Sequence, residues 1–198
     1  MSDYEIFLED ILTSISASRN TNFPEIYHHV RQIPYGGAGQ RDPKIVYETN
    51  LGSCSGKHIL LRDLLRASGF KCQVITIFTH FNKRIPPHAS MPDQLIDIIT
   101  NARVPDFHHF VRIKTTDGRL LNLDATWHDG LLDYGFPVNG GWDGSGDTQL
   151  AGFSLKELPL EEDIINQKVQ LLSTLNRQET ELRKLFLALL SNWFAKLN

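Results

Sequence analysis

Cysteine is scarce in this sequence: only Cys54 and Cys72 occur among 198 residues. Two cysteines cannot form a disulfide framework, and they exclude a zinc site built from four cysteines. So few cysteines are typical of a protein kept in a reducing compartment, and we therefore expect a cytoplasmic location. A secreted chain numbered after removal of its signal peptide would have the same composition, although acidic residues stand where a signal peptide would carry lysine or arginine.

Positive charge and long apolar runs are also lacking. The formal net charge is -3, the isoelectric point is about 6.2, and the basic residues are scattered along the chain. This distribution gives no electrostatic reason to expect a nucleic acid or an anionic membrane as a partner. No apolar run approaches the roughly 18 residues that a membrane-spanning helix needs. We therefore expect a soluble protein that binds neither nucleic acid nor membranes.

Motifs that hold metals and nucleotides are missing as well. The histidines at 28, 29, 80 and 88 have neither the spacing of a His-Glu-x-x-His helix nor paired cysteines beside them. The glycine-rich stretch over residues 36–40 lacks the preceding strand and the lysine of a phosphate-binding loop. We therefore expect no catalytic metal and no cofactor.

The pattern of what is present indicates one α+β domain over residues 1–198. Apolar residues at helical spacing predict a helix over residues 59–70 that ends at Gly69. The β-branched run over residues 73–79 predicts a strand. Two further short strands, 110–114 and 120–123, are joined by turn residues and form an antiparallel hairpin.

The remaining segments are predicted to surround this helix and sheet. Residues 133–154 have the composition of a loop, and apolar residues at helical spacing predict one or two long helices over about 161–198. Nearer the amino terminus we expect two short helices within 1–33 with a break at 20–22, a surface loop over 34–43, and an insertion with a short helix over 82–105.

Cys54 lies in a turn of small residues at the start of the predicted helix. Unpaired backbone N–H groups and the helix dipole favour a thiolate at such a position, which is how a nucleophile is activated. The small neighbours let a substrate approach the backbone closely, and an amide N–H there could stabilise an oxyanion. A free cysteine is also often simply buried, as we expect for Cys72. Position alone leaves both interpretations of Cys54 open.

The predicted hairpin supplies the partners that a cysteine nucleophile needs, namely a base and a group that orients the base. His108 and His109 stand at the start of one strand, and Asp124 follows the end of the next. The two ends of a hairpin lie side by side, which brings these side chains together. Each residue alone is more simply a surface histidine or a turn aspartate, so the argument rests on the combination. His58 also follows Cys54 on the helix, but we do not expect it to be the base.

Four short motifs resemble the pattern of the transglutaminase-like superfamily, whose cysteine enzymes share a papain-like core. The motifs are Gly52-Ser53-Cys54, Arg66-Ala67-Ser68-Gly69, His108-His109-Phe110-Val111 and Leu123-Asp124-Ala125-Thr126. The resemblance covers about residues 48–128. It implies a papain-like or transglutaminase-like α+β core, in which the nucleophile-bearing helix packs on an antiparallel sheet, with extra N- and C-terminal helices.

The resemblance also implies a catalytic triad. Cys54 would be the nucleophile, His108 the general acid and base, and Asp124 the residue that orients the imidazole. Phe110 stands where the family usually has tryptophan, and Arg112 where it usually has an acidic residue. Successive strand residues point to opposite faces, so only one of the two imidazoles can face Cys54. Phe110 takes the family's aromatic position only if His108 is the base, so we assign the base to His108 and expect His109 on the other face or at the substrate rim. The insertion over 82–105 is expected to cap or narrow the cleft.

The implied activity is that of a cysteine-dependent enzyme acting on amide bonds through an acyl-thioester intermediate. Its substrate would be a peptide, a protein or a small amide. Hydrolysis by a protease or amidase is the favoured outcome, and acyl transfer to an amine is the other. The competing hypothesis is a non-catalytic module that uses the same fold to bind a peptide or protein, but such a module has no chemical need for the full set of residues.

Overall fold

The computed structural model describes residues 1–15, 23–36 and 40–197. It confirms the two predicted N-terminal helices, α1 (Asp3–Ser14) and α2 (Phe23–Gln32). The predicted break at 20–22 and residues 37–39 of the predicted loop lie outside the described residues. A short helix that the sequence analysis missed, α3 (Pro43–Glu48), begins where Asp42 accepts hydrogen bonds from the backbone N–H groups of Lys44 and Ile45.

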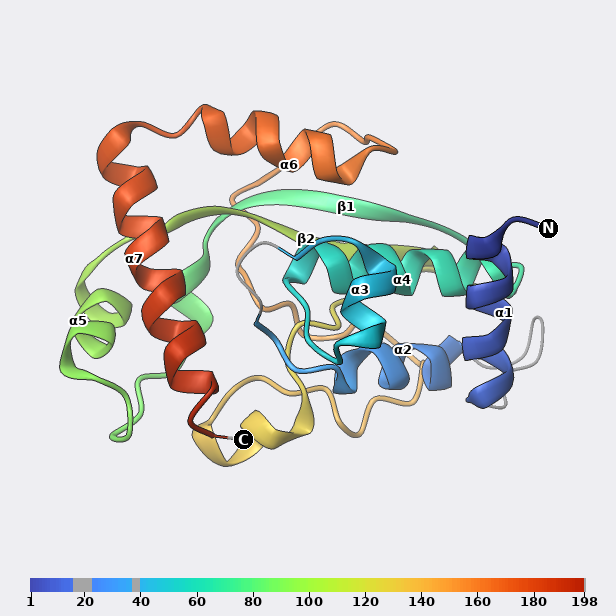
Figure 1. Ribbon diagram of the computed structural model, residues 1–198, viewed down its shortest axis with the longest axis horizontal. Coiled ribbons are helices and arrows are strands. Elements are labelled where there is room, and N and C mark those ends of the chain that lie inside the picture. Colours follow the sequence, from blue (N-terminus) through green and yellow to red (C-terminus); the bar gives the residue numbers. More distant parts are fainter. Residues whose placement is uncertain (16–22, 37–39, 198) are drawn as a thin grey trace.

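The described strands form one antiparallel sheet in the order β3-β2-β1-β4 (Figure 1). The predicted strands are confirmed as β1 (Lys71–His80), β2 (Pro105–Lys114) and β3 (Leu120–Leu123). β2 begins earlier than predicted because its pairing with β1 continues as far as Pro105 opposite His80. His108 and His109 therefore lie inside the strand, opposite Ile77 and Thr76, and not at its start. β4 (Lys156–Glu157), an edge strand of two residues, was not predicted.

Helix α4 (Cys54–Ala67) begins at the cysteine and has well-defined caps at both ends. The side chain of Ser53 accepts a hydrogen bond from the backbone N–H of Gly56 and so caps the first turn. At the other end Gly69 adopts a φ of 88°, and the N–H of Phe70 donates to the carbonyl of Leu65 at 2.9 Å. This is the glycine-terminated ending predicted from the sequence.

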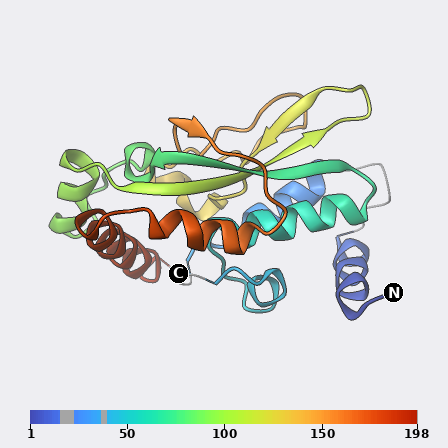
Figure 2. The ribbon, with the colours of Figure 1, turned by 90° about the horizontal axis from the view of Figure 1, so that it is seen from above.

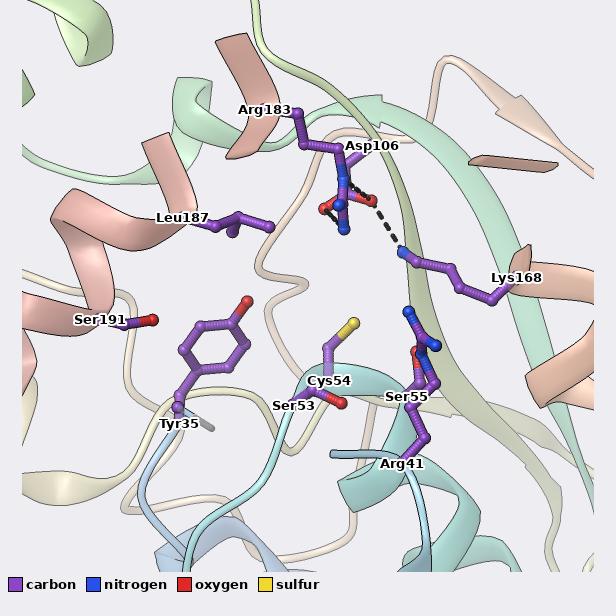
Figure 3. Close-up of a pocket in the computed structure, with 11 residues that line it drawn as sticks. Tyr35, Arg41, Ser53, Cys54, Ser55, Asp106, Lys168, Arg183, Leu187 and Ser191 are labelled. Carbon is purple, nitrogen blue, oxygen red and sulfur yellow. Dashed lines mark hydrogen bonds and ion pairs between the residues drawn. The ribbon is translucent and has the colours of Figure 1, made fainter. Parts of the chain in front are cut away.

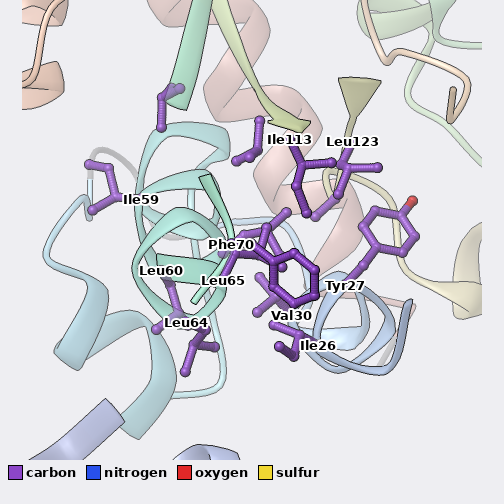
Figure 4. Packing of buried hydrophobic residues seen from close by; sticks show 14 of the residues in the cluster. Ile26, Tyr27, Val30, Ile59, Leu60, Leu64, Leu65, Phe70, Ile113 and Leu123 are labelled. Carbon is purple, nitrogen blue, oxygen red and sulfur yellow. The ribbon is translucent and has the colours of Figure 1, made fainter. Parts of the chain in front are cut away.

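The body of α4 lies between the sheet and the N-terminal helices (Figures 1 and 2). Its four buried leucines at 60, 61, 64 and 65 are each 0% exposed, and they share one cluster with Val111 and Ile113 of β2 and with Ile26 and Val30 of α2 (Figure 4). Burying each leucine contributes about 1.5–3 kcal/mol. The packing confirms the predicted α+β fold, in which the helix that carries Cys54 rests on an antiparallel sheet.

A second apolar cluster fills the end of the molecule where α4 begins. The C-terminal helices are confirmed as α6 (Ile164–Ser173) and α7 (Arg177–Phe194), and the predicted insertion contains α5 (Asp93–Asn101) and the 3-10 turn η1 (Phe81–Arg84). Another 3-10 turn, η2 (Asp129–Tyr134), was not predicted and ends at the start of the predicted loop over 133–154. α7 packs against α5 and β2, and its Phe186, Leu190 and Trp193 share the cluster with Cys54.

None of the helices in the described part of the chain is long and apolar enough to cross a membrane.

Candidate active site

Cys54 is the first residue of α4 and lies at the second apolar cluster, 7% exposed. Gly52, two residues earlier, sets the path by which the chain enters the helix. It forms a β-bridge with Tyr35 and makes backbone hydrogen bonds with the neighbouring residues Pro34 and Gly36. A Cβ at position 52 would lie 2.7 Å from Val46, so only glycine fits. The bridge brings the phenol ring of Tyr35 to the cavity beside the thiol (Figure 3).

His108 and Asp124 are joined as the sequence analysis expected. Nε2 of His108 lies 2.6 Å from Oδ2 of Asp124, and both side chains are buried. The same carboxylate accepts hydrogen bonds from the backbone N–H of Ala151 at 2.7 Å and of Thr126 at 3.0 Å. Burial opposes the charge on each partner, but the pairing outweighs it. It holds the pKa of Asp124 well below its usual range and raises the pKa of His108 to about 10.

His109 is fully buried against the first turn of α4. Its Nδ1 lies 3.8 Å from Sγ of Cys54 and 3.2 Å from Oγ of Ser55. The expectation that His109 lies on the face away from the cysteine or at the substrate rim is therefore wrong. Burial and the neighbouring positive charges of Lys168 and His108 hold the pKa of His109 well below its usual value, so this imidazole is neutral at pH 7.

Opposing effects act on the pKa of the Cys54 thiol. Burial raises the pKa of Cys54, but His108 and the ammonium of Lys168 outweigh it, and the pKa of the thiol falls below its ordinary value. A charged His108 next to an acidified thiol favours a thiolate and imidazolium pair. His108 thus lowers the pKa of Cys54, whereas His109 contacts the thiol with its own pKa shifted in the opposite direction to that of His108.

His58 has a structural role. Its Nδ1 lies 2.7 Å from the carbonyl oxygen of Cys54, and its Nε2 accepts a hydrogen bond from the backbone N–H of Ala125 at 2.8 Å. Both ring nitrogens are occupied, so His58 ties the end of β3 to α4. Cys72 is partly buried against the core, and burial raises the pKa of its thiol to about 12. Trp127 is buried among aromatic rings, where it packs against Tyr35 and Phe136.

A cavity of about 50 Å³ opens beside the thiol (Figure 3). The C-terminal helices line it, with Lys168 from α6 and Arg183 from α7, and the predicted insertion does not. Asp106 of β2 pairs with both cations, at 2.7 Å to Nζ of Lys168 and 3.0 Å to Nε of Arg183. Lys168 also donates to the carbonyl of Phe107. The expectation that the insertion over 82–105 caps the cleft is thus not met at this cavity.

The sequence analysis missed these cavity residues because no local pattern links them. Asp106 and Lys168 are 62 positions apart, and each alone resembles an ordinary charged residue of a strand or helix. One signal was available: Lys168 stands on a helix face with Ile164, Leu171 and Leu172, where an apolar residue would be expected. Among the residues that the structure describes, no group of three or more histidine, cysteine or acidic side chains is arranged to hold a metal ion.

Comparison with known proteins agrees with this arrangement. The model of the transglutaminase-like superfamily core matches residues 12–125, which is more than half of the chain. The chain therefore belongs to the transglutaminase-like superfamily, a family of cysteine-dependent enzymes. No match is found among curated proteins. The matched region ends before α6 and α7, so the residues that these helices bring to the cavity lie outside it.

Proposed function

We propose that this protein is a cysteine-dependent enzyme that acts on amide bonds through an acyl-thioester, with Cys54, His108 and Asp124 as its catalytic triad. The observation that carries the proposal is the 2.6 Å contact between His108 and Asp124, which raises the pKa of His108 to about 10 beside an acidified thiol. A nucleophile, an acid and an orienting carboxylate are the groups that this chemistry requires.

The reaction proceeds in two steps. In the first, the Cys54 thiolate attacks the carbonyl carbon of the amide, and free N–H groups of the first turn of α4 stabilise the oxyanion. The C–N bond then breaks, and the His108 imidazolium gives its proton to the leaving amine. In the second step His108 takes a proton from water, which attacks the acyl-thioester; the C–S bond breaks, releasing a carboxylic acid and restoring the thiolate.

Peptide or amide hydrolysis is the outcome we favour, and transfer of the acyl group to an amine is the alternative. The cavity of about 50 Å³ supports this preference. A site needs roughly 10–15 Å³ to hold one water molecule, so water fits beside a bound acyl group more easily than a long amine does. The substrate class is a peptide, a protein or a small amide.

Intact-mass measurement tests the proposal directly. The protein is mixed with a panel of peptide amides and activated esters, quenched in acid, and examined for an acyl adduct on Cys54. Wild type should gain an adduct that hydroxylamine removes, and Cys54→Ala should gain none. Adding a primary amine then separates the two outcomes, because hydrolysis yields only the free acid. No adduct, together with an ordinary rate of Cys54 alkylation by iodoacetamide, would favour a non-catalytic peptide- or protein-binding module.

A further inference from the structure

The cavity beside Cys54 carries an excess of positive charge. Three of its lining residues are cations, Arg41, Lys168 and Arg183, and one is a carboxylate, Asp106. Lys168 and Asp106 are almost entirely buried, at 2% and 5% exposed. Excess charge next to a buried pair is costly unless an anion compensates it. Asp124 already balances the charge of His108, so the Cys54 thiolate offsets one of the cavity cations and Asp106 another. One positive charge then remains in excess.

Arg41 is the cation without a partner in this cavity. Asp106 engages Lys168 at 2.7 Å and Arg183 through two contacts of 3.0 and 3.2 Å. The guanidinium of Arg41, by contrast, makes no hydrogen bond or ion pair with any residue that the structure describes. Figure 3 shows it above Ser55, directed along the cavity towards Lys168. A guanidinium in this setting presents a planar fork of donors suited to a carboxylate.

The position of Arg41 is built into the start of α4. The hydroxyl of Ser53 donates to the carbonyl of Gln40 at 2.7 Å. Gly56 allows the same segment to approach the helix, since a Cβ there would lie 2.9 Å from that carbonyl oxygen and 3.1 Å from Cα of Arg41. The backbone that carries Arg41 is therefore pressed against the turn that carries the nucleophile.

We propose that the cavity recognises a small anionic group, most simply a carboxylate, that lies next to the scissile carbonyl of the substrate, and that Arg41 is the residue that binds it. The proposal rests on the function proposed above and narrows its substrate class to acidic amides or peptides. The volume of about 50 Å³ limits the anion to a few heavy atoms. Asp106 is a positioning residue here, because it holds Lys168 and Arg183 at the cavity.

Two small alkylating reagents test this charge preference without any substrate. Iodoacetate and iodoacetamide have nearly the same shape, and both transfer a carbon to the thiolate with loss of iodide, but only iodoacetate is an anion. The rate of each at Cys54 is measured by peptide mass mapping, which separates Cys54 from Cys72. The rate with iodoacetate is divided by the rate with iodoacetamide, and this ratio is then divided by the same ratio measured for N-acetylcysteine.

For wild type we expect this normalised ratio to exceed one by about tenfold, the effect of roughly one favourable unit charge a few ångströms away in a partly desolvated site. Arg41→Gln should lower it by about fivefold, because one cation is lost while the fold is retained. Lys44→Gln is the matched control: it removes the same charge three residues further along, at an exposed site, and should leave the ratio unchanged. Circular dichroism confirms folding of both variants.

Three outcomes would overturn the proposal: a normalised ratio near one in wild type, equal effects of Arg41→Gln and Lys44→Gln, or failure of both reagents to reach Cys54. The reagents also separate this proposal from the proposed function. An anion preference without any acyl adduct would support the anion site and contradict the proposed enzyme activity. An acyl adduct without an anion preference would support the enzyme activity and contradict the anion site.

Discussion

Burial lowers the pKa of both adjacent histidines in β2, but only His108 has a carboxylate partner that reverses the effect. Asp124 accepts a hydrogen bond from His108 and stabilises its charged form, against the effect of burial. Burial, together with the nearby ammonium of Lys168, lowers the pKa of His109, whose contacts are with the hydroxyl of Ser55 and the thiol of Cys54. Only His108 is therefore equipped to balance a thiolate.

The pH dependence of Cys54 alkylation by iodoacetamide should report this difference. In wild type the thiolate should persist well below the pKa of about 8.5 of a free cysteine. His108→Ala removes one of the two cations that lower the thiol pKa, so the alkylation curve should shift to higher pH. His109→Ala should leave the curve close to wild type.

Turnover on any working substrate should follow the same order. His108→Ala should lose activity about as completely as Cys54→Ala, since residues of a triad act as a unit, and His109→Ala should keep a measurable fraction. If His109→Ala produces the larger shift and the larger loss, the base is His109 and the contact of 3.8 Å with Sγ is the catalytic one.

Asp124→Asn should slow turnover while preserving the fold. Asparagine has the same size but can offer a donor to Nε2 of His108, which favours the wrong tautomer. In a serine triad the equivalent change lowers turnover about 10⁴-fold. We expect a smaller loss here, because the thiolate forms before attack and depends less on a base. Steady-state rates and circular dichroism provide the test. A folded, fully active variant would show that Asp124 has no catalytic role.

At the scale of elements, a buried lysine in the first turns of α4 binds the helix to three neighbouring segments. The ammonium of Lys57 donates to the backbone carbonyls of Arg31, Ile33 and Thr126, at 3.1, 2.5 and 3.1 Å. These carbonyls belong to the end of α2, the segment that follows it, and the chain after β3. Burial lowers the pKa of Lys57 to about 7. One side chain thus holds three segments at the end of the helix that carries the nucleophile.

Lys57→Met should therefore destabilise the protein although it preserves apolar bulk. Each buried carbonyl left without a donor costs about 1–3 kcal/mol, and partial access of water reduces the sum to roughly 3 kcal/mol. Urea denaturation at pH 6, below the lowered pKa of Lys57, measures the change with the ammonium in its three-donor form. The control is Lys44→Met at an exposed site, which should change stability by less than about 0.5 kcal/mol. Equal effects of the two substitutions would contradict the role assigned to Lys57.

At the scale of the whole molecule, the C-terminal helices complete the surroundings of a site whose core lies in residues 12–125. α6 and α7 reach the site through Lys168 and Arg183, which meet on Asp106. Burial opposes the charge of Asp106, but the two cations lower its pKa far below the usual range. Removing one member of such a buried cluster leaves the others without compensation.

Asp106→Asn should cost about 3 kcal/mol of stability at pH 7, because it leaves the buried Lys168 and the half-buried Arg183 without a carboxylate. The direction of the pH dependence follows from the lowered pKa of Asp106. The ion pairs of Asp106 contribute fully to stability above the unfolded-state pKa of about 3.9, and their contribution declines as the pH falls below that value. The difference between wild type and variant should therefore shrink as the pH is lowered from about 4. Asp133→Asn, at an exposed position, is the control. A difference independent of pH would show that Asp106 contributes through packing alone.

Local patterns were sufficient for most elements. The apolar stripe and Gly69 predicted α4, β-branched residues predicted β1, and the turn residues predicted the pairing of β2 with β3. The close contact of His108 with Asp124 also followed, because a hairpin brings the ends of its two strands together whatever surrounds it. These features depend on residues that are near one another in the sequence or joined by one tight turn.

Tertiary contacts alone decided the rest. The sequence by itself determined the helix that starts at Cys54, the hairpin and the membership of a cysteine enzyme family. Only the folded chain placed His109 against Ser55, extended β2 to Pro105, and gathered Arg41, Lys168 and Arg183 around one cavity. The physical reason is that periodicity and turn propensity act over a few residues, whereas the charge and burial of a site depend on which distant side chains pack beside it.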